Sequence, residues 1–214
     1  MKPKTSTWIF NPSIYIAGWT SMALGWAIMI ATAVTGYFSN THLDGVIGAG
    51  FGLPAPLWLY LVEAAVAWLS LCLTLFIAAR IVSKTSFRLV DLMGTQALAR
   101  APMFIVPFLG FPEAGRKVTR YLLYRTLGLG EETTATYADI VLFILITIIM
   151  ILVVIWMIVL MYNSYKVSCN LKGTKAGVSF TLALILAQAI ASAFFMLAFK
   201  DIYLNPEGLN YYLN

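Results

Sequence analysis

One carboxylate stands inside an apolar run that begins at Leu57 and ends near Val82. If this run crosses a membrane, a charge at the bilayer centre costs about 2.5–3.5 kcal/mol, so Glu63 must face protein, water or the interface. Ser70 and Thr74 follow Glu63 at helical spacing and predict one polar face turned toward neighbouring helices. Two interpretations stay open: a pathway for an ion, proton or substrate, or a structural carboxylate. The position of Glu63 near the helix start favours the structural role.

A lone arginine in the segment 92–112 is the second charged candidate. Proline fixes φ and removes a hydrogen-bond donor, so Pro102 and Pro107 predict either a kinked span or a re-entrant hairpin. Arg100 could pair with Glu63, reach lipid phosphates, or serve the carbonyl groups near Pro102. The candidate intramembrane polar residues are therefore Glu63, Ser70, Thr74, Arg100 and Gln188.

Catalytic and metal-binding patterns are sparse in this sequence. The chain has one histidine, His42, and no cluster of Cys, His and carboxylates at metal-ligand spacing, so we expect no metal and no cofactor. The glycines of "GVIGAGFG" do not follow a strand of a βαβ unit, which argues against a nucleotide site. His42 and Asp44 could form an acid–base pair, but "HLD" is typical of an exposed turn. We therefore expect no enzymatic activity.

The composition sets the class of protein. Of the 214 residues, 61% are hydrophobic and 11% are charged, against about 45–50% and 25% in soluble domains. Residues 140–161 contain one polar side chain, that of Thr147, and at about 1.5 Å per residue they can cross a hydrocarbon core of about 30 Å. Long apolar runs without alternation predict an all-α, polytopic transmembrane helical bundle instead of a β-barrel.

Five spans are expected within a single domain that covers residues 1–214, together with one interfacial helix. The spans lie at about 14–37, 57–82, 92–112, 138–162 and 176–199, and the interfacial helix at about 115–129. With five spans and the N-terminus inside, eight Lys and Arg residues lie inside and five outside; with a re-entrant third segment, eleven lie inside and three outside. The positive-inside rule alone favours four spans.

A basic corner separates the last two spans. Lys166, Lys172 and Lys175 lie between apolar runs, where ammonium groups can anchor a turn at headgroup depth. The alternative is a docking patch for an acidic partner or a lipid. The net charge of +5 is consistent with flanks that contact anionic headgroups, and we expect no nucleic-acid partner.

Two stretches of the sequence carry a resemblance to known proteins. The first is "TSFRLVDLMGTQALARAPMFI" at 85–105, and the second is "VLMYNSYKVSCNLKGTKAGVSFTLALIL" at 159–186. Both are similar to stretches of the Yip-domain (Ypt/Rab-interacting protein) family of five-helix membrane proteins. The matching positions are Phe87, Asp91, Thr95, Ala99 and Pro102 in the first, and Tyr165, Val167, Leu171, Lys175 and Ala176 in the second. The likeness covers roughly residues 10–200 and implies five spans with the two termini on opposite sides of the membrane, the N-terminus inside.

The resemblance also shapes the expected function. Eukaryotic Yip-domain proteins are linked to vesicle trafficking and small GTPases through a long cytosolic N-terminal region, whereas about a dozen residues precede the first span here. This departure argues against small-GTPase binding, and the chain looks more like the short prokaryotic members of the inner membrane. The first expectation is a non-enzymatic scaffold or adaptor that organises membrane, binds membrane proteins or associates with itself. The alternative is a small transporter or channel component with a polar path near Glu63 and Arg100.

Overall fold

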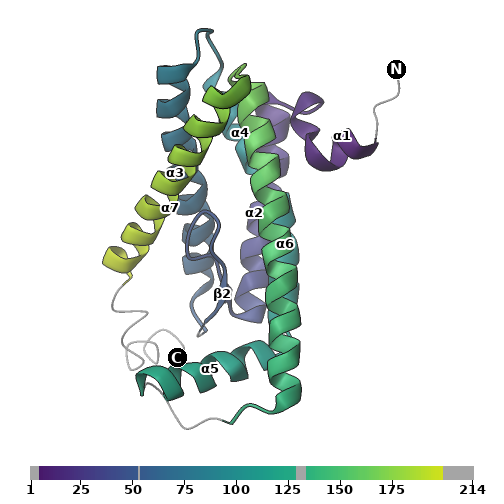
Figure 1. The fold of residues 1–214 in the computed structure, drawn as a ribbon, viewed down its shortest axis with the longest axis vertical. Coiled ribbons are helices and arrows are strands. Elements are labelled where there is room, and N and C mark those ends of the chain that lie inside the picture. The colour runs from purple at the N-terminus through teal and green to yellow at the C-terminus, as the bar shows by residue number, and fades with distance from the viewer. Residues whose placement is uncertain (1–4, 53, 129–133, 200–214) are drawn as a thin grey trace.

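The computed structural model describes residues 5–52, 54–128 and 134–199 and is an all-α bundle (Figure 1). Within these residues, five helical segments are long and apolar enough to cross a membrane, which confirms the predicted fold class and makes this the architecture of an integral membrane protein. The helices α2 (Gly18–Ser39), α3 (Leu57–Val82), α6 (Tyr137–Ser168) and α7 (Gly173–Ala198) provide four of the segments. The remaining one, Leu89–Gly110, joins α4 (Leu89–Ala99) to the 3-10 helix η2 (Ala101–Gly110).

The third segment passes through the bundle instead of turning back. At its far end η2 contacts the helix α5 (Glu113–Leu127) and the short strand β1 (Thr41–His42). Pro102 stands in the first turn of η2 and Pro107 inside it, so the backbone changes from α to the tighter 3-10 form just after Arg100. The predicted proline break is therefore present, but as a change of helix type within a continuous span. The charge count, which favoured four spans, was the poorer guide.

Close backbone approach joins α2 to α4. A Cβ on Gly25 would lie 2.5 Å from the backbone of Ala97, and a Cβ on Gly94 would lie 2.6 Å from the carbonyl oxygen of Gly18. Small residues allow this approach in lipid, where water does not drive helices together. On the other side of the bundle α7 packs along α3, with its small residues Ser179, Ala183, Ala187 and Ala191 buried.

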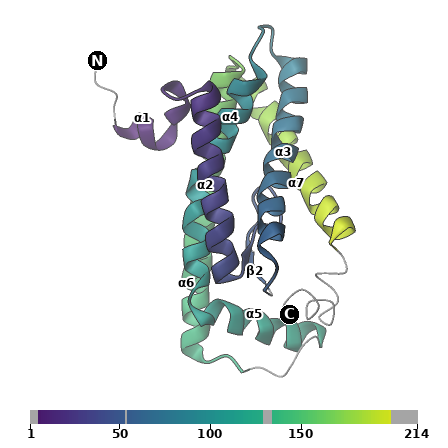
Figure 2. The ribbon, with the colours of Figure 1, turned by 180° about the vertical axis from the view of Figure 1, so that it is seen from behind.

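The long helix α6 lies at the periphery. Only 17% of its most apolar 18-residue stretch is buried inside the bundle, the smallest share among the five segments. It carries large aliphatic side chains on nearly every face, so lipid is the natural neighbour of most of them. In Figures 1 and 2, α6 and α7 meet at one end and diverge toward the other.

Shorter helical elements flank the spans at both ends (Figure 2). The amphipathic helix α5 lies across one end, two residues earlier than the predicted 115–129. At the other end lie α1 (Thr5–Phe10) and the 3-10 turn η1 (Pro12–Ile14), so the first membrane helix begins at Gly18 and not near residue 14. Gly18 has a φ of +64°, a conformation that favours glycine where η1 gives way to α2. The fourth span runs on to Ser168, six residues beyond its predicted end.

Candidate functional site

The connection between α2 and α3 enters the bundle and forms the centre of the candidate site. β1 pairs with β2 (Gly50–Phe51) in an antiparallel arrangement, with His42 opposite Gly50. Between the two strands, residues 43–49 form a loop, called here the inserted loop, that lies among the membrane helices (Figure 1). Val46 at its tip has 0% exposure. Irregular backbone at membrane depth must be buried in protein or line a cavity, so side chains of the helices have to hold this loop.

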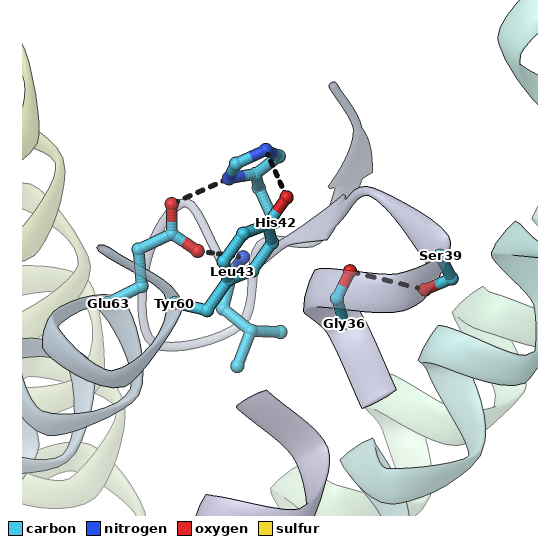
Figure 3. Close-up of polar contacts among 6 residues, drawn as sticks. All are labelled: Gly36, Ser39, His42, Leu43, Tyr60 and Glu63. Atoms are coloured by element: carbon cyan, nitrogen blue, oxygen red, sulfur yellow. Dashed lines mark hydrogen bonds and ion pairs between the residues drawn. The ribbon is translucent and has the colours of Figure 1, made fainter. Parts of the chain in front are cut away.

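Glu63 of α3 binds the start of the inserted loop (Figure 3). Its Oε1 lies 2.8 Å from Nδ1 of His42, and its Oε2 accepts a hydrogen bond from the amide of Leu43 at 2.9 Å. The carboxyl group is fully buried. Glu63 therefore holds, by two contacts of its carboxylate, the chain that leads into the loop.

His42 connects this carboxylate to an aromatic ring. Its Nε2 lies 3.1 Å from the hydroxyl of Tyr60, and the two rings are stacked with centroids 4.5 Å apart. A neutral imidazole with its proton on Nδ1 satisfies both contacts: Nδ1–H donates to Glu63, and Nε2 accepts from the Tyr60 hydroxyl. All three side chains are buried. Both ring nitrogens are therefore engaged, Nδ1 by Glu63 and Nε2 by Tyr60.

Arg100 holds the tip of the inserted loop. It caps the end of α4, is 2% exposed, and donates from Nη1 to the carbonyl oxygen of Val46 at 3.2 Å. Its Nη2 is buried and has no hydrogen-bond partner in the described part of the chain. The guanidinium thus serves a carbonyl of the loop, 54 residues away in sequence, and not one of the carbonyl groups freed by Pro102.

Gln188 of α7 holds the part of the inserted loop that follows its tip. Its Oε1 accepts from the amide of Ile47 at 3.1 Å, and its Nε2 donates to Ser192 at 3.0 Å. A Cβ at Gly45 would overlap the amide of Gln188, so a larger residue there would displace this amide from its present position. Three of the predicted polar residues, one from each of three spans, therefore converge on one loop.

The other two predicted residues of this group do not reach the loop. The hydroxyl of Thr74 donates to the carbonyl oxygens of Ser70 and Leu71 within its own helix. Ser70 is buried, and its carbonyl group is the acceptor in this local contact. These two side chains satisfy the polar requirements of α3.

His42 and Tyr60 are the site residues that sequence reasoning missed. The prediction of an exposed turn for "HLD" is wrong for His42, which is 6% exposed, although Asp44 is exposed. The feature of the sequence that indicated the burial of His42 was the run of glycines near it. A Cβ at Gly52 would lie 2.5 Å from Cδ2 of His42. Glycine here permits backbone to pack directly on the imidazole, which is a reason for a glycine-rich segment that has nothing to do with phosphate.

The basic corner is a hydrogen-bonded turn between α6 and α7. Lys166 lies in the last turn of α6, with its Nζ 5.2 Å from the centre of the Tyr162 ring, whereas Lys172 and Lys175 are exposed around the start of α7. The amide of Leu171 donates to the carbonyl oxygen of Lys166, and that of Asn170, at φ 50°, donates to Val167. This is a Schellman motif, which ends a helix in a fixed geometry.

Among the described residues there is no group of three or more His, Cys, Asp or Glu side chains that could hold a metal ion. Comparisons with protein-family models, with curated proteins and with solved structures found no match.

Proposed function

We propose that this protein is a non-enzymatic membrane scaffold or adaptor of the Yip-domain type, which organises the membrane or binds other membrane proteins. The observation that supports it best is that the side chains of Glu63, Arg100 and Gln188 all bind the inserted loop. A transport route needs polar groups that face a path, but these side chains contact residues of one buried connection. The polar groups of the interior then serve the architecture, and contacts with partners fall to the outer surface of the bundle.

The setting proposed for this activity is the cytoplasmic membrane of a prokaryote, with the N-terminus inside. Its proposed partners are anionic lipid headgroups, other membrane proteins or further copies of the chain, and not nucleic acid. The exposed apolar side chains along α6 and the amphipathic helix α5 support a role exerted through lipid contact.

A flux assay tests this proposal. The purified full chain is reconstituted into liposomes that contain a pH-sensitive dye and potassium, and the leak of protons and potassium is compared with that of empty liposomes. The expected result is equal leak for the wild type, Glu63→Gln and empty liposomes. A leak that the wild type adds, and that Glu63→Gln abolishes while keeping the same elution volume in detergent, would overturn the proposal.

A small transporter or channel component is the second candidate, and one observation favours it. Nη2 of Arg100 and Oε1 of Gln96 are buried without hydrogen-bond partners in the described part of the chain; Gln96 lies on α4 and Arg100 caps its end. Unsatisfied groups of this kind inside a bundle are where a polar solute or water would bind. If the protein is a transporter or channel component, Arg100→Gln should alter the selectivity or rate of the flux that the wild type shows. If it is a scaffold, the wild type shows no flux.

A further inference from the structure

A pocket lies beside the basic corner, and none of the residues that line it belongs to the inserted loop. It has a volume of ≈ 450 Å³ and is lined by Asn11, Asn163, Lys166, Val167, Asn170, Leu171 and Lys172. Two lysines and three asparagines therefore contribute to the lining of one open space at the end of α6. Lys175, the third lysine of the corner, does not line it.

Both walls of this pocket are fixed. The Schellman motif holds the wall that carries Lys166 and Lys172, and Ser83 at the end of α3 donates to the carbonyl oxygen of Cys169 at 3.0 Å. The opposite wall is the segment around Asn11. Asn163 donates to the carbonyl oxygen of Phe10 at 2.8 Å, so a side chain of α6 holds this wall in place.

Two further bonds tie the N-terminal segment to α6. The Ser13 hydroxyl lies 2.6 Å from that of Ser164, and Trp156 donates to the carbonyl oxygen of Ile9 at 3.0 Å. None of these bonds uses the side chain of Asn11. That side chain has a buried oxygen, Oδ1, without a hydrogen-bond partner among the described residues. A buried amide oxygen without a donor is rare and indicates a missing partner.

The position of the pocket limits what can enter it. It lies where one apolar span ends and the next begins, which is the depth of lipid headgroups. Lys166 and Lys172 favour an anion there, and the unpartnered oxygen of Asn11 accepts from a donor group. A ligand with a phosphate and a hydroxyl group satisfies both requirements.

We propose that this pocket binds the headgroup of an anionic phospholipid that carries a free hydroxyl, of the phosphatidylglycerol class. Lys166 and Lys172 contact the phosphate, and Oδ1 of Asn11 accepts a hydrogen bond from a headgroup hydroxyl. Lys175 contributes only to the general positive charge of the corner. This inference deepens the proposed function and rests on it, since it names the lipid that the adaptor recognises.

Native mass spectrometry of the full chain in detergent, at about 0.15 M ionic strength, tests the site. The probes are phosphatidylglycerol, phosphatidic acid, which lacks a headgroup hydroxyl, phosphatidylcholine, and free glycerol phosphate. We expect Lys166→Gln and Lys172→Gln each to weaken phosphatidylglycerol binding about fivefold and together about thirtyfold, and the control Lys175→Gln to change it less than about twofold. Asn11→Ala should weaken binding of phosphatidylglycerol but not of phosphatidic acid.

Three results would overturn the assignment: equal losses for all three lysine variants, an unchanged preference in the double variant, or glycerol phosphate binding as strongly as the lipid. Thermal unfolding of each variant shows whether a loss of binding is a loss of folding. The liposome flux assay tests the scaffold proposal separately from the lipid site. A protein that leaks ions can still bind phosphatidylglycerol selectively, and a protein that does not leak can still bind all lipids equally.

Discussion

Replacing Glu63 tests whether His42 is neutral, a form that satisfies both of its hydrogen bonds. In Glu63→Gln the amide oxygen still accepts from Leu43, and the amide nitrogen donates to Nδ1 if the imidazole proton moves to Nε2. Two charge-assisted bonds become neutral ones, a loss of about 1–2 kcal/mol. In Glu63→Leu two buried donors lose their acceptor at about 1–3 kcal/mol each, so the expected loss of unfolding free energy is about 2–6 kcal/mol.

The assay is unfolding by SDS in mixed micelles, followed by tryptophan fluorescence and circular dichroism. Glu113→Gln is the control, because Glu113 and Lys117 form an exposed pair worth at most about 0.5 kcal/mol. If Glu63→Gln loses about 3–5 kcal/mol and matches Glu63→Leu, the interaction is a buried ion pair with a charged imidazolium, and the neutral tautomer inferred here is wrong.

Two further predictions concern packing and thiol chemistry. Gly25→Ala should destabilise the fold by about 1–3 kcal/mol because its Cβ would overlap Ala97, whereas Gly177→Ala, with its nearest neighbour at 4.0 Å, should not; equal unfolding midpoints would contradict the close approach of α2 and α4. Burial raises the pKa of the Cys169 thiol from 9.0 to about 12, so at neutral pH the thiolate fraction falls by roughly a thousandfold. Maleimide should therefore label Cys169 only after denaturation, and labelling of the native protein within minutes would refute this.

Hydropathy and residue chemistry predicted the five membrane segments, because the length of an apolar run and the cost of burying backbone are local properties. The same reasoning located the break at Pro102, where a missing donor changes the helix type whatever lies around it. Glu63, Arg100 and Gln188 were recognisable as polar groups that need partners. Each of these inferences uses only a residue and its immediate sequence context.

The partners themselves could not be predicted, because they depend on how the segments pack. The bond between Gln188 and Ile47 joins positions 141 residues apart, and the loop that receives it has no hydrophobic period of its own. His42 looked solvent-exposed because its surroundings are turn-forming residues. Likewise the three lysines of the corner are equivalent in sequence, and only the geometry of the turn places Lys175 outside the pocket.

The inserted loop has a consequence for biogenesis. Val46 and Ile47 emerge from the ribosome long before Gln188, and their anchors lie on α4 and α7. A chain whose last helix has not yet entered the bilayer therefore exposes polar backbone that its finished fold covers. Completion of α7 is the step that seals the interior. Until that step the amide of Ile47 lacks the acceptor that Gln188 provides in the finished fold.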